Sequence, residues 1–246
     1  MTNSTKIALI TGAARRIGKV IATRLHKEGF HIILHYHHSE TEALNLQKKL
    51  HANRPDSVGL IRQDLLADKA AQTIIDYVVQ QHGQLDVLVN NASIFYKSPL
   101  EIEKEPHAND LFICNVLAPY QLSLCARPLL RQSKGVIINI TDIHGSKALK
   151  NYSLYCQSKA ALIMQTKSLA KEFAPDIRVN AVAPGAIDWP EGENALSAQQ
   201  KQNIVHKTPL QQHGDAEYIA QAVVSLIENP FITGQNLAVD GGRSIA

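Results

Sequence analysis

The feature that most constrains this chain is the alternation, from end to end, of two kinds of apolar segment. The first kind is a short continuous run rich in β-branched residues, which is typical of strands covered on both faces. These runs, each of which we expect to be a strand, are Ile7–Ile10, His31–His35, Val58–Ile61, Val87–Val89, Val136–Ile140, Ile177–Val182 and Leu237–Val239.

The second kind of segment is longer, and its apolar residues recur at the helical spacing of three and four. These segments are Ile17–Lys27, Ala70–Gln80, Leu111–Arg131, Leu154–Phe173 and Ala216–Ile227. Strands and helices in alternation favour a parallel sheet with right-handed crossovers. The sequence therefore predicts an α/β fold, a Rossmann-type doubly wound parallel sheet with helices on both faces.

No internal repeat, low-complexity stretch or linker divides the 246 residues, so we expect a single domain over 1–246. One irregular stretch, 184–207, combines prolines and glycines with polar residues and Trp189. Ligands of such sheets bind at the carboxyl ends of the strands. We expect this stretch to be a mobile substrate loop with a short helix, lying over that edge as a lid.

Composition argues against several classes of protein. The net charge is only +3 and the basic residues are spread along the chain, which does not favour nucleic-acid binding. Cys114, Cys125 and Cys156 lack the spacing of a disulfide framework or of metal ligands, so we expect a reducing compartment and no metal. Without a signal-peptide layout or a membrane-length apolar run, we expect a cytoplasmic protein with no membrane partner.

The first strand leads into Thr11–Gly18, a glycine-containing turn at the start of a helix. Glycine lets the backbone approach a pyrophosphate, whose charge is favoured by the N-terminus of the helix. Such turns are weak evidence alone, because Gly12 can merely form a tight turn and Gly18 can merely allow close helix packing. The turn nevertheless makes this end of the sheet a candidate dinucleotide site.

The second and third strands end in polar residues that bear on the choice of cofactor. After the second strand come His35, Tyr36, His37, His38 and Ser39, where a protein selective for NAD usually has an acidic residue. Histidines and hydroxyls can receive a 2′-phosphate instead, so we expect NADPH. The alternative is that these are ordinary surface histidines.

Asp64 and Leu65 follow the third strand. Asp64 is placed to bind an adenine amino group. The alternative is that Asp64 caps the next helix.

Tyr155 and Lys159 are four residues apart, which places them on one face of a predicted helix. A lysine cation favours the phenolate of a nearby tyrosine and so makes it a better acid. The spacing is common by chance. Asn90-Asn91-Ala92, Asn115 and Thr141-Asp142 lie at positions that converge on the same edge of the sheet, and this convergence favours a catalytic site.

Together these residues resemble the short-chain dehydrogenase/reductase family over essentially the full length. The resemblance implies hydride transfer from a nicotinamide, a tyrosine proton donor, a lysine that lowers the tyrosine pKa, an asparagine that fixes a proton-relay water, and a homotetramer. The matching elements are Thr11–Gly18, Asp64, Asn90-Asn91-Ala92, Asn115, Tyr155 with Lys159, Asn180, Pro184-Gly185, Thr233-Gly234 and Asp240-Gly241-Gly242.

Two departures from the family pattern are informative. Arg16 replaces the middle glycine of the turn, and Asp142 replaces the serine that orients a substrate carbonyl. A serine hydroxyl suits a ketone, whereas an aspartate accepts from amino groups or passes a proton towards a ring nitrogen. Both replacements are similar to those of pteridine reductases, as are Ser93 and Phe95.

That resemblance implies that Phe95 stacks on a pterin while Ser93 and Arg16 position pterin and cofactor phosphates. The subfamily often has an arginine where this chain has His38. The alternatives are that Phe95 packs a loop and that Asp142 is structural.

We therefore expect NADPH-dependent reduction of a dihydropterin such as dihydromonapterin, dihydrobiopterin or dihydrofolate. The rivals are a carbonyl reductase for a 3-ketoacyl thioester or small ketone, and a non-catalytic dinucleotide-binding scaffold. The expected catalytic set is Asn115, Asp142, Tyr155 and Lys159, and the expected substrate set is Arg16, Ser93, Phe95, Asp142 and Tyr155. The expected cofactor set is Gly12, Arg16, Ile17, Gly18, His35, Tyr36, His37, His38, Ser39, Asp64, Leu65, Asn91, Ala92, Ser93, Tyr155, Lys159, Pro184 and Gly185.

Overall fold

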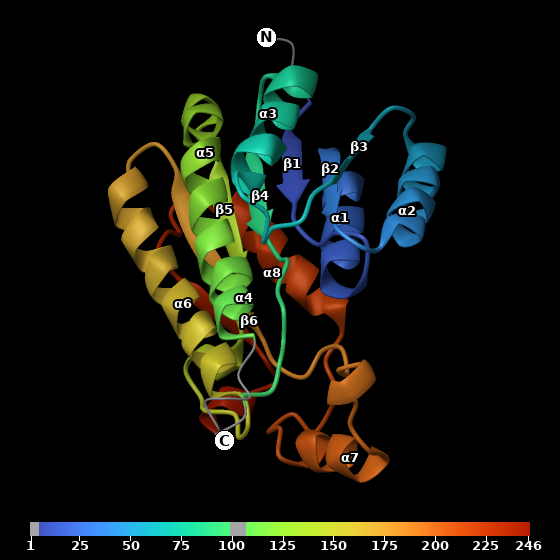
Figure 1. Ribbon diagram of the computed structural model, residues 1–246, viewed down its shortest axis with the longest axis vertical. Helices are drawn as coiled ribbons and strands as arrows, with labels where there is room; N and C mark the ends of the chain where they lie inside the picture. Colours follow the sequence, from blue (N-terminus) through green and yellow to red (C-terminus); the bar gives the residue numbers. More distant parts are fainter. Residues whose placement is uncertain (1–4, 99–106) are drawn as a thin grey trace.

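The computed structural model describes residues 5–98 and 107–246, and a seven-stranded sheet forms its centre (Figure 1). The spatial order of the strands is β3-β2-β1-β4-β5-β6-β7, and every neighbouring pair is parallel. The strands are β1 (Ile7–Ile10), β2 (His31–Tyr36), β3 (Val58–Arg62), β4 (Val87–Asn90), β5 (Val136–Ile140), β6 (Arg178–Pro184) and β7 (Asn236–Val239).

The order of the strands reverses between β1 and β4. The chain runs outward from β1 to β3, returns to β4 beside β1, and then runs outward the other way to β7. In a doubly wound sheet this reversal opens a crevice at the carboxyl ends of the strands, where ligands bind. The predicted doubly wound parallel sheet is confirmed.

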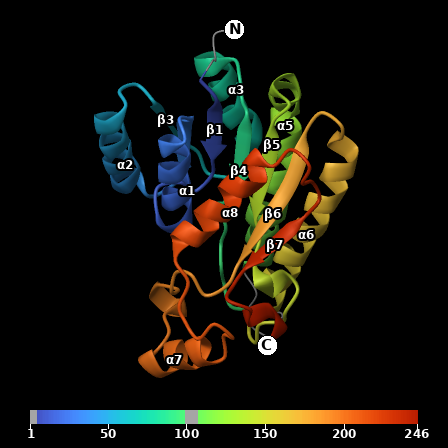
Figure 2. The ribbon, with the colours of Figure 1, turned by 180° about the vertical axis from the view of Figure 1, so that it is seen from behind.

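Helices cover both faces of the sheet, and the two views in Figures 1 and 2 show one layer each. In β1, Ala8 and Ile10 belong to one buried cluster, whereas Ile7 and Leu9 belong to the other. Strands buried on both sides carry apolar residues continuously, which explains the unbroken runs in the sequence. One layer contains α1 (Arg16–Lys27), α2 (Glu40–Asn53) and α8 (Ala216–Glu228), and the other contains α3 (Ala70–His82), α5 (Ala118–Ser133) and α6 (Ser153–Phe173).

Two helical segments differ from the sequence-based expectation. Helix α2 was not among the predicted helices, since only Ala43, Leu46 and Leu50 of it are buried and its remaining residues are mostly polar. The helix predicted over Leu111–Arg131 is divided into α4 (Ala108–Phe112), a π-helical turn (Ile113–Leu117) and α5. Pro119 lacks the N–H that would bond to the carbonyl of Asn115 in a regular helix, which favours the wider turn.

The irregular stretch 184–207 lies beyond the carboxyl ends of the strands. It contains a 3₁₀ turn (Gly192–Asn194) and the short helix α7 (Ala198–His206), which stands apart from the sheet layers in both views (Figures 1 and 2). Within the two described ranges, no helix combines the length and apolarity that crossing a bilayer would require.

Candidate active site

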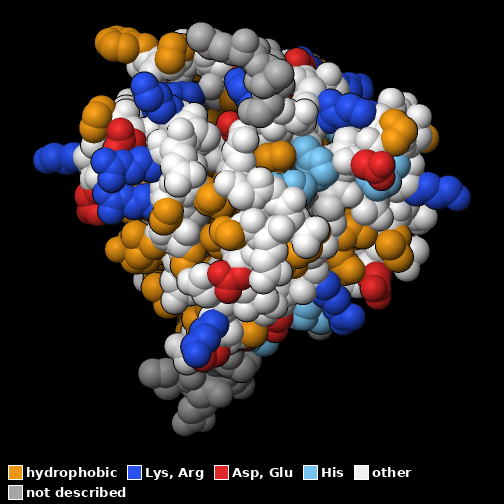
Figure 3. Space-filling view, turned by 90° about the horizontal axis from the view of Figure 1, so that it is seen from above, with side chains coloured by type: hydrophobic (Ala, Val, Ile, Leu, Met, Phe, Trp, Pro, Cys, Tyr) orange, Lys and Arg blue, Asp and Glu red, His pale blue; other side chains and the backbone are white. Residues whose placement is uncertain are grey.

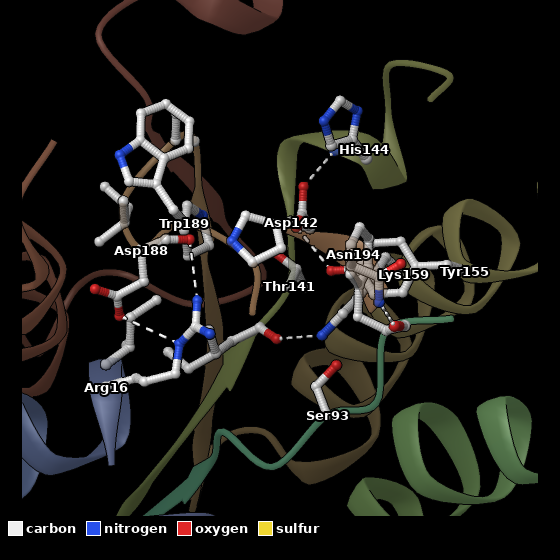
Figure 4. Close-up of a pocket in the computed structure, with 18 of the residues that line it drawn as sticks. Arg16, Ser93, Thr141, Asp142, His144, Tyr155, Lys159, Asp188, Trp189 and Asn194 are labelled. Atoms are coloured by element: carbon white, nitrogen blue, oxygen red, sulfur yellow. Dashed lines mark hydrogen bonds and ion pairs between the residues drawn. The ribbon is translucent and has the colours of Figure 1, made fainter. Parts of the chain in front are cut away.

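A cavity of about 660 Å³ opens at the carboxyl ends of the strands, at the crevice beside β1 and β4. Its wall combines the turn after β1, the segments after β4, β5 and β6, the start of α6, and the C-terminal segment. Ten of its residues are labelled in Figure 4. The expected site residues on the wall are Gly12, Arg16, Ile17, Gly18, Asn91, Ala92, Ser93, Phe95, Asp142, Tyr155, Lys159, Pro184 and Gly185.

The turn after β1 leaves no room for side chains at its glycines. Gly12 has a left-handed backbone (φ +61°), and a Cβ there would lie 3.0 Å from the Ala92 Cα. A Cβ on Gly18 would lie 2.4 Å from the Gly12 carbonyl oxygen. Arg16 has φ +52°, so it keeps the left-handed backbone that glycine adopts without strain. This cradle at the start of α1 fits the pyrophosphate of a dinucleotide.

The segment after β4 fixes this turn. The Thr11 hydroxyl oxygen accepts hydrogen bonds from the backbone N–H groups of Asn91 (2.9 Å) and Ala92 (3.0 Å). The Asn91 side-chain amide donates to the carbonyls of Thr11 (2.9 Å) and Gly12 (3.0 Å). Asn91 therefore holds the shape of the turn in addition to lining the cavity.

His35 is placed differently from the expectation that it meets a cofactor phosphate. Its ring is 2% exposed, its Nδ1 accepts from the Gly12 N–H (3.2 Å), and its Nε2 lies 2.9 Å from the Gln63 carbonyl. Burial lowers the pKa of His35 to about 4, so the ring is neutral. The neutral ring holds the glycine turn through its hydrogen bond with the Gly12 N–H. Tyr36 is also buried and does not offer its ring at the surface.

The other residues expected near the adenosine lie outside the cavity, at the ends of β2 and β3. His37 and Ser39 are partly exposed and His38 is exposed. Asp64 does not cap α3, which begins at Ala70; its Oδ1 accepts from the Leu66 N–H (2.9 Å) and lies 3.6 Å from the His37 Nδ1. Leu65 is buried in the core.

Three of the four catalytic residues expected from the sequence, Asp142, Tyr155 and Lys159, meet at the end of β5. The Tyr155 hydroxyl donates to the Asp142 Oδ2 (2.7 Å), and the Asp142 Oδ1 accepts from the His144 N–H (2.8 Å) (Figure 4). Lys159 is buried, its Nζ donates to the Ile140 carbonyl (3.0 Å), and it lies 5.8 Å from the centroid of the Tyr155 ring. Asp142 and Tyr155 thus face the cavity as one hydrogen-bonded pair.

The pKa values of this group are shifted mainly by burial. Burial, followed by the charge and hydrogen bond of Asp142, holds the pKa of Tyr155 well above its usual value of 10.0. Burial also lowers the pKa of Lys159 to about 8. Lys159 is not among the groups that shift the pKa of Tyr155 in this structure, so the expectation that it lowers that pKa stays a prediction.

Asn115 lies in the π-helical turn and is not among the residues that line the cavity. Its Oδ1 accepts from the Ile94 N–H (2.9 Å), and its Nδ2 donates to the Ile94 carbonyl (3.0 Å) and the Ser158 hydroxyl (3.1 Å). These contacts tie the segment after β4 to α6. The structure therefore places Asn115 as a brace between two walls of the site.

Phe95 contributes an aromatic ring to the cavity. One face of the ring stacks on Tyr152, with centroids 4.3 Å apart and 7° between the planes, and Tyr155 meets it edge-on at 4.6 Å. Asn194 joins this cluster to the 184–207 segment, since its Nδ2 donates to the Phe95 carbonyl (2.8 Å) and its Oδ1 accepts from the Tyr152 hydroxyl (2.8 Å). Ser93 is exposed nearby on the same segment.

The glycine turn is also joined to the 184–207 segment. Arg16 donates to the Asp188 carbonyl (3.0 Å), and its Nε lies 3.6 Å from the Asp188 Oδ2 (Figure 4). Arg15 pairs with Glu191 at 2.7 Å. These two contacts hold the segment across the cavity mouth.

Several residues of the wall were not found by sequence reasoning. They are Arg15, His144, Tyr152, Asp188, Glu191, Asn194 and Arg243. Tyr152 had a usable signal, because it lies three residues before Tyr155 and so near the same helix face. The others lie in irregular segments, where side-chain direction does not follow from spacing.

Comparison with known proteins finds a family model and relatives that match nearly the whole chain. A family model described as enoyl-(acyl carrier protein) reductase matches residues 12–244. Pteridine reductase 1 of Leishmania tarentolae is 34% identical, covering 97% of this chain and 96% of that protein. The 3-oxoacyl-[acyl-carrier-protein] reductase FabG of Staphylococcus aureus is 37% identical, covering 97% of this chain and 98% of that protein.

Proposed function

Because the chain belongs to the short-chain dehydrogenase/reductase family, whose members are oxidoreductases that use a nicotinamide dinucleotide, we propose that it reduces a dihydropterin with NADPH. The observation that carries the pterin assignment is the 2.7 Å hydrogen bond from the Tyr155 hydroxyl to Asp142. It puts a carboxylate beside the proton donor, where the family pattern has a serine.

The chain's own residues supply the binding and proton chemistry. Gly12 and Gly18 form the pyrophosphate cradle, and Lys159 and Tyr155 line the deeper wall. When bound, a reduced nicotinamide supplies the hydride. Tyr155 keeps its proton at neutral pH and delivers it to the substrate as the general acid. Lys159 then offsets the negative charge left on the tyrosine oxygen.

Asp142 favours a nitrogen heterocycle over a ketone. A carboxylate accepts hydrogen bonds from ring N–H and amino groups, whereas a ketone oxygen offers it nothing to accept. Phe95 lines the cavity, and because Tyr152 covers one face of its ring, a flat substrate ring would stack on the other face. Both features support a pterin.

The proposed preference for NADPH rests on the end of β2. His37, His38 and Ser39 offer ring nitrogens and a hydroxyl there; no acidic residue lies among them in the sequence, and the Asp64 carboxylate is 3.6 Å from the His37 Nδ1. A homotetramer is the proposed assembly. Leu117 and Leu124 in the α5 region and Met164 on α6 keep exposed apolar side chains, which supports contact between copies.

A second candidate function is reduction of a 3-oxoacyl thioester. The observation that favours it is the 37% identity to a 3-oxoacyl-[acyl-carrier-protein] reductase over nearly the whole of both chains. It would use the same Tyr155 and Lys159.

The deciding experiment measures steady-state kinetics with NADPH and NADH against one dihydropterin and one 3-oxoacyl thioester. We expect the wild type to favour the dihydropterin and NADPH. Phe95→Ala should raise the pterin KM about fivefold, since stacking contributes about 1 kcal/mol. Asp142→Ser should lower the pterin kcat about a hundredfold.

The matched control is Asp176→Ser, which removes a surface carboxylate paired with Arg131. Asp176→Ser should leave kcat and KM unchanged for both substrates and both cofactors. Wild-type turnover of the thioester alone, or pterin kinetics that both site variants leave unaltered, would replace the pterin assignment with the second candidate.

A further inference from the structure

The C-terminal segment contributes a cation to the cavity wall that the proposed chemistry does not use. The cationic side chains on the wall are those of Arg15, Arg16, Lys159 and Arg243. Arg15 and Arg16 belong to the cofactor turn and pair with the 184–207 segment, and Lys159 lies beneath Tyr155. Arg243 also lines the cavity, and it belongs to the 3₁₀ turn Arg243–Ile245 of the C-terminal segment.

The backbone of Arg243 is held in place from both sides. Lys147, from the segment after β5, donates its Nζ to the Arg243 carbonyl (2.9 Å) and to the Ala246 carbonyl. Asp240 accepts from the N–H groups of Gly242 (2.9 Å) and Ser244 (2.6 Å). A side chain on a fixed backbone loses less entropy when it binds a ligand.

The guanidinium of Arg243 has unused hydrogen-bonding capacity. Its Nη1 donates to the Ile204 carbonyl of α7 (3.2 Å), and its Nε and Nη2 meet no acceptor among residues 5–98 and 107–246. The side chain is half-buried; burial lowers its pKa, and the carboxylates of Asp142 and Asp240 oppose that shift. Arginine remains charged throughout, so a partly desolvated cation with free donors faces the same space as Asp142.

The surroundings of Arg243 suit a substrate tail rather than a reacting ring. Leu149, Leu196 and Ile204 line the same cavity and are apolar, and the Ile204 carbonyl accepts from Arg243. In the proposed function the glycine turn binds the cofactor, and the Asp142–Tyr155 pair contacts the reacting atoms of the substrate. What extends past Asp142 towards α7 and the C-terminal segment is the part of the substrate that does not react.

We infer that Arg243 is a specificity-determining residue that binds an anionic group, a carboxylate or phosphate, on the non-reacting tail of the substrate. The identity of the reacting ring rests on the proposed function, whereas the negative charge of the tail is inferred from Arg243 alone. An apolar wall strengthens such a pairing because it lowers the local dielectric. Arginine also presents paired donors that match the two oxygens of a carboxylate.

The test uses two substrate pairs in which tail charge is removed. One pair is dihydrofolate and its dimethyl ester, which differ only at the two carboxylates. The other is acetoacetyl-coenzyme A and the uncharged N-acetylcysteamine thioester. We expect Arg243→Gln to raise KM for the charged member about tenfold or more, with kcat and the uncharged member within twofold. Arg243→Lys keeps the charge but not the paired donors, so it should restore only part of the loss, and added salt should weaken the wild-type preference.

Glutamine keeps an N–H donor for the Ile204 carbonyl of α7. The Gln variant therefore removes the positive charge of Arg243 while keeping a donor for the hydrogen bond to α7. The control Arg131→Gln removes a surface arginine paired with Asp176 and should change neither member. An equal KM change for both members, or a loss confined to kcat, overturns the inference. If only the thioester pair is turned over, the pterin proposal fails and that pair decides the role of Arg243. A wild-type enzyme that turns over none of the four substrates contradicts both the pterin proposal and the proposed role of Arg243.

Discussion

At the scale of single residues, the pairing of Tyr155 with Asp142 decides the protonation state in which catalysis begins. The buried hydroxyl donates to a carboxylate 2.7 Å away, and both burial and that carboxylate disfavour the phenolate. In the proposed reaction Tyr155 therefore starts protonated. In that proposal, substrate entry changes the acceptor of the Tyr155 hydrogen bond from Asp142 to the substrate atom that takes the proton.

Tyr155→Phe tests this role directly. The ring and its edge contact with Phe95 survive, and only the proton donor is removed. We expect kcat to fall at least about a hundredfold, the usual range for loss of a general acid, while NADPH affinity stays within about twofold. Turnover is followed by NADPH absorbance and binding by fluorescence titration. Turnover close to wild type, or a defect in NADPH binding alone, would remove Tyr155 from the proposed role.

At the scale of elements, the site depends on how closely α1 approaches the glycine turn. Gly18 on α1 lies against the Gly12 carbonyl and the Asn91 amide, where a Cβ would be 2.4 and 2.5 Å from them. Asn91 belongs to the segment after β4, so β1, α1 and β4 meet at one point. The geometry thus supports the interpretation that Gly18 allows close helix packing. This close packing of α1 also gives the cofactor cradle its shape.

Gly18→Ala should displace this junction. Because backbone and a hydrogen-bonded amide stand in the way, we expect a loss of about 1–3 kcal/mol in unfolding free energy and at least tenfold weaker NADPH binding. Lys19→Ala, at the exposed neighbouring position of α1, is the matched control and should change neither quantity. Urea unfolding and fluorescence titration measure the two effects. An alanine variant that binds NADPH as tightly as wild type would show that the turn does not need this close approach.

At the scale of the whole molecule, histidines gather at the edge where the strands begin, opposite the cavity. Figure 3 looks onto this end of the molecule and shows histidine side chains on its surface. His31 and His82 have ring centroids 4.4 Å apart, and the His26 Nε2 lies 2.7 Å from the Ser57 hydroxyl. Burial, and then the neighbouring His82 and Arg54, lower the pKa of His31 to about 4. Burial also lowers the pKa values of His26 and His82.

This arrangement predicts acid sensitivity. The folded chain keeps His31 neutral to about pH 4, whereas the unfolded chain protonates it near 6.5, so the unfolded state binds more protons between these values. The unfolding free energy should be highest above pH 6.5 and fall towards pH 4, and the slope from His31 should stay below the limit of about 1.4 kcal/mol per pH unit because water screens the partly exposed ring.

Urea unfolding at pH 7.5, 6.0 and 5.0 measures that slope. His31→Gln removes one titrating ring and should flatten it, while His206→Gln, on α7 and away from this edge, should not. Identical slopes in wild type and His31→Gln would refute the assignment.

The sequence by itself determined the fold class and the place of the site. Burial on both faces makes strands continuous apolar runs, and parallel strands bring their carboxyl ends to one edge, so local pattern suffices. For the same reason Gly12, Asp142, Tyr155 and Lys159 were expected together, and each lines the cavity. These residues sit on or directly beside regular elements, whose geometry fixes side-chain direction.

Only the tertiary structure decided which groups touch. His35 was expected at a phosphate and instead lies buried under the turn, because strand alternation could not show how deeply β2 is covered. Asn194 reaches the Phe95 carbonyl across 99 residues, and Lys147 reaches the Arg243 carbonyl across 96. Such contacts come from loops and from the chain end, whose paths depend on packing rather than on a repeating local preference. The pKa of Tyr155 follows from the same cause, since burial and the position of Asp142 exist only once the chain has folded.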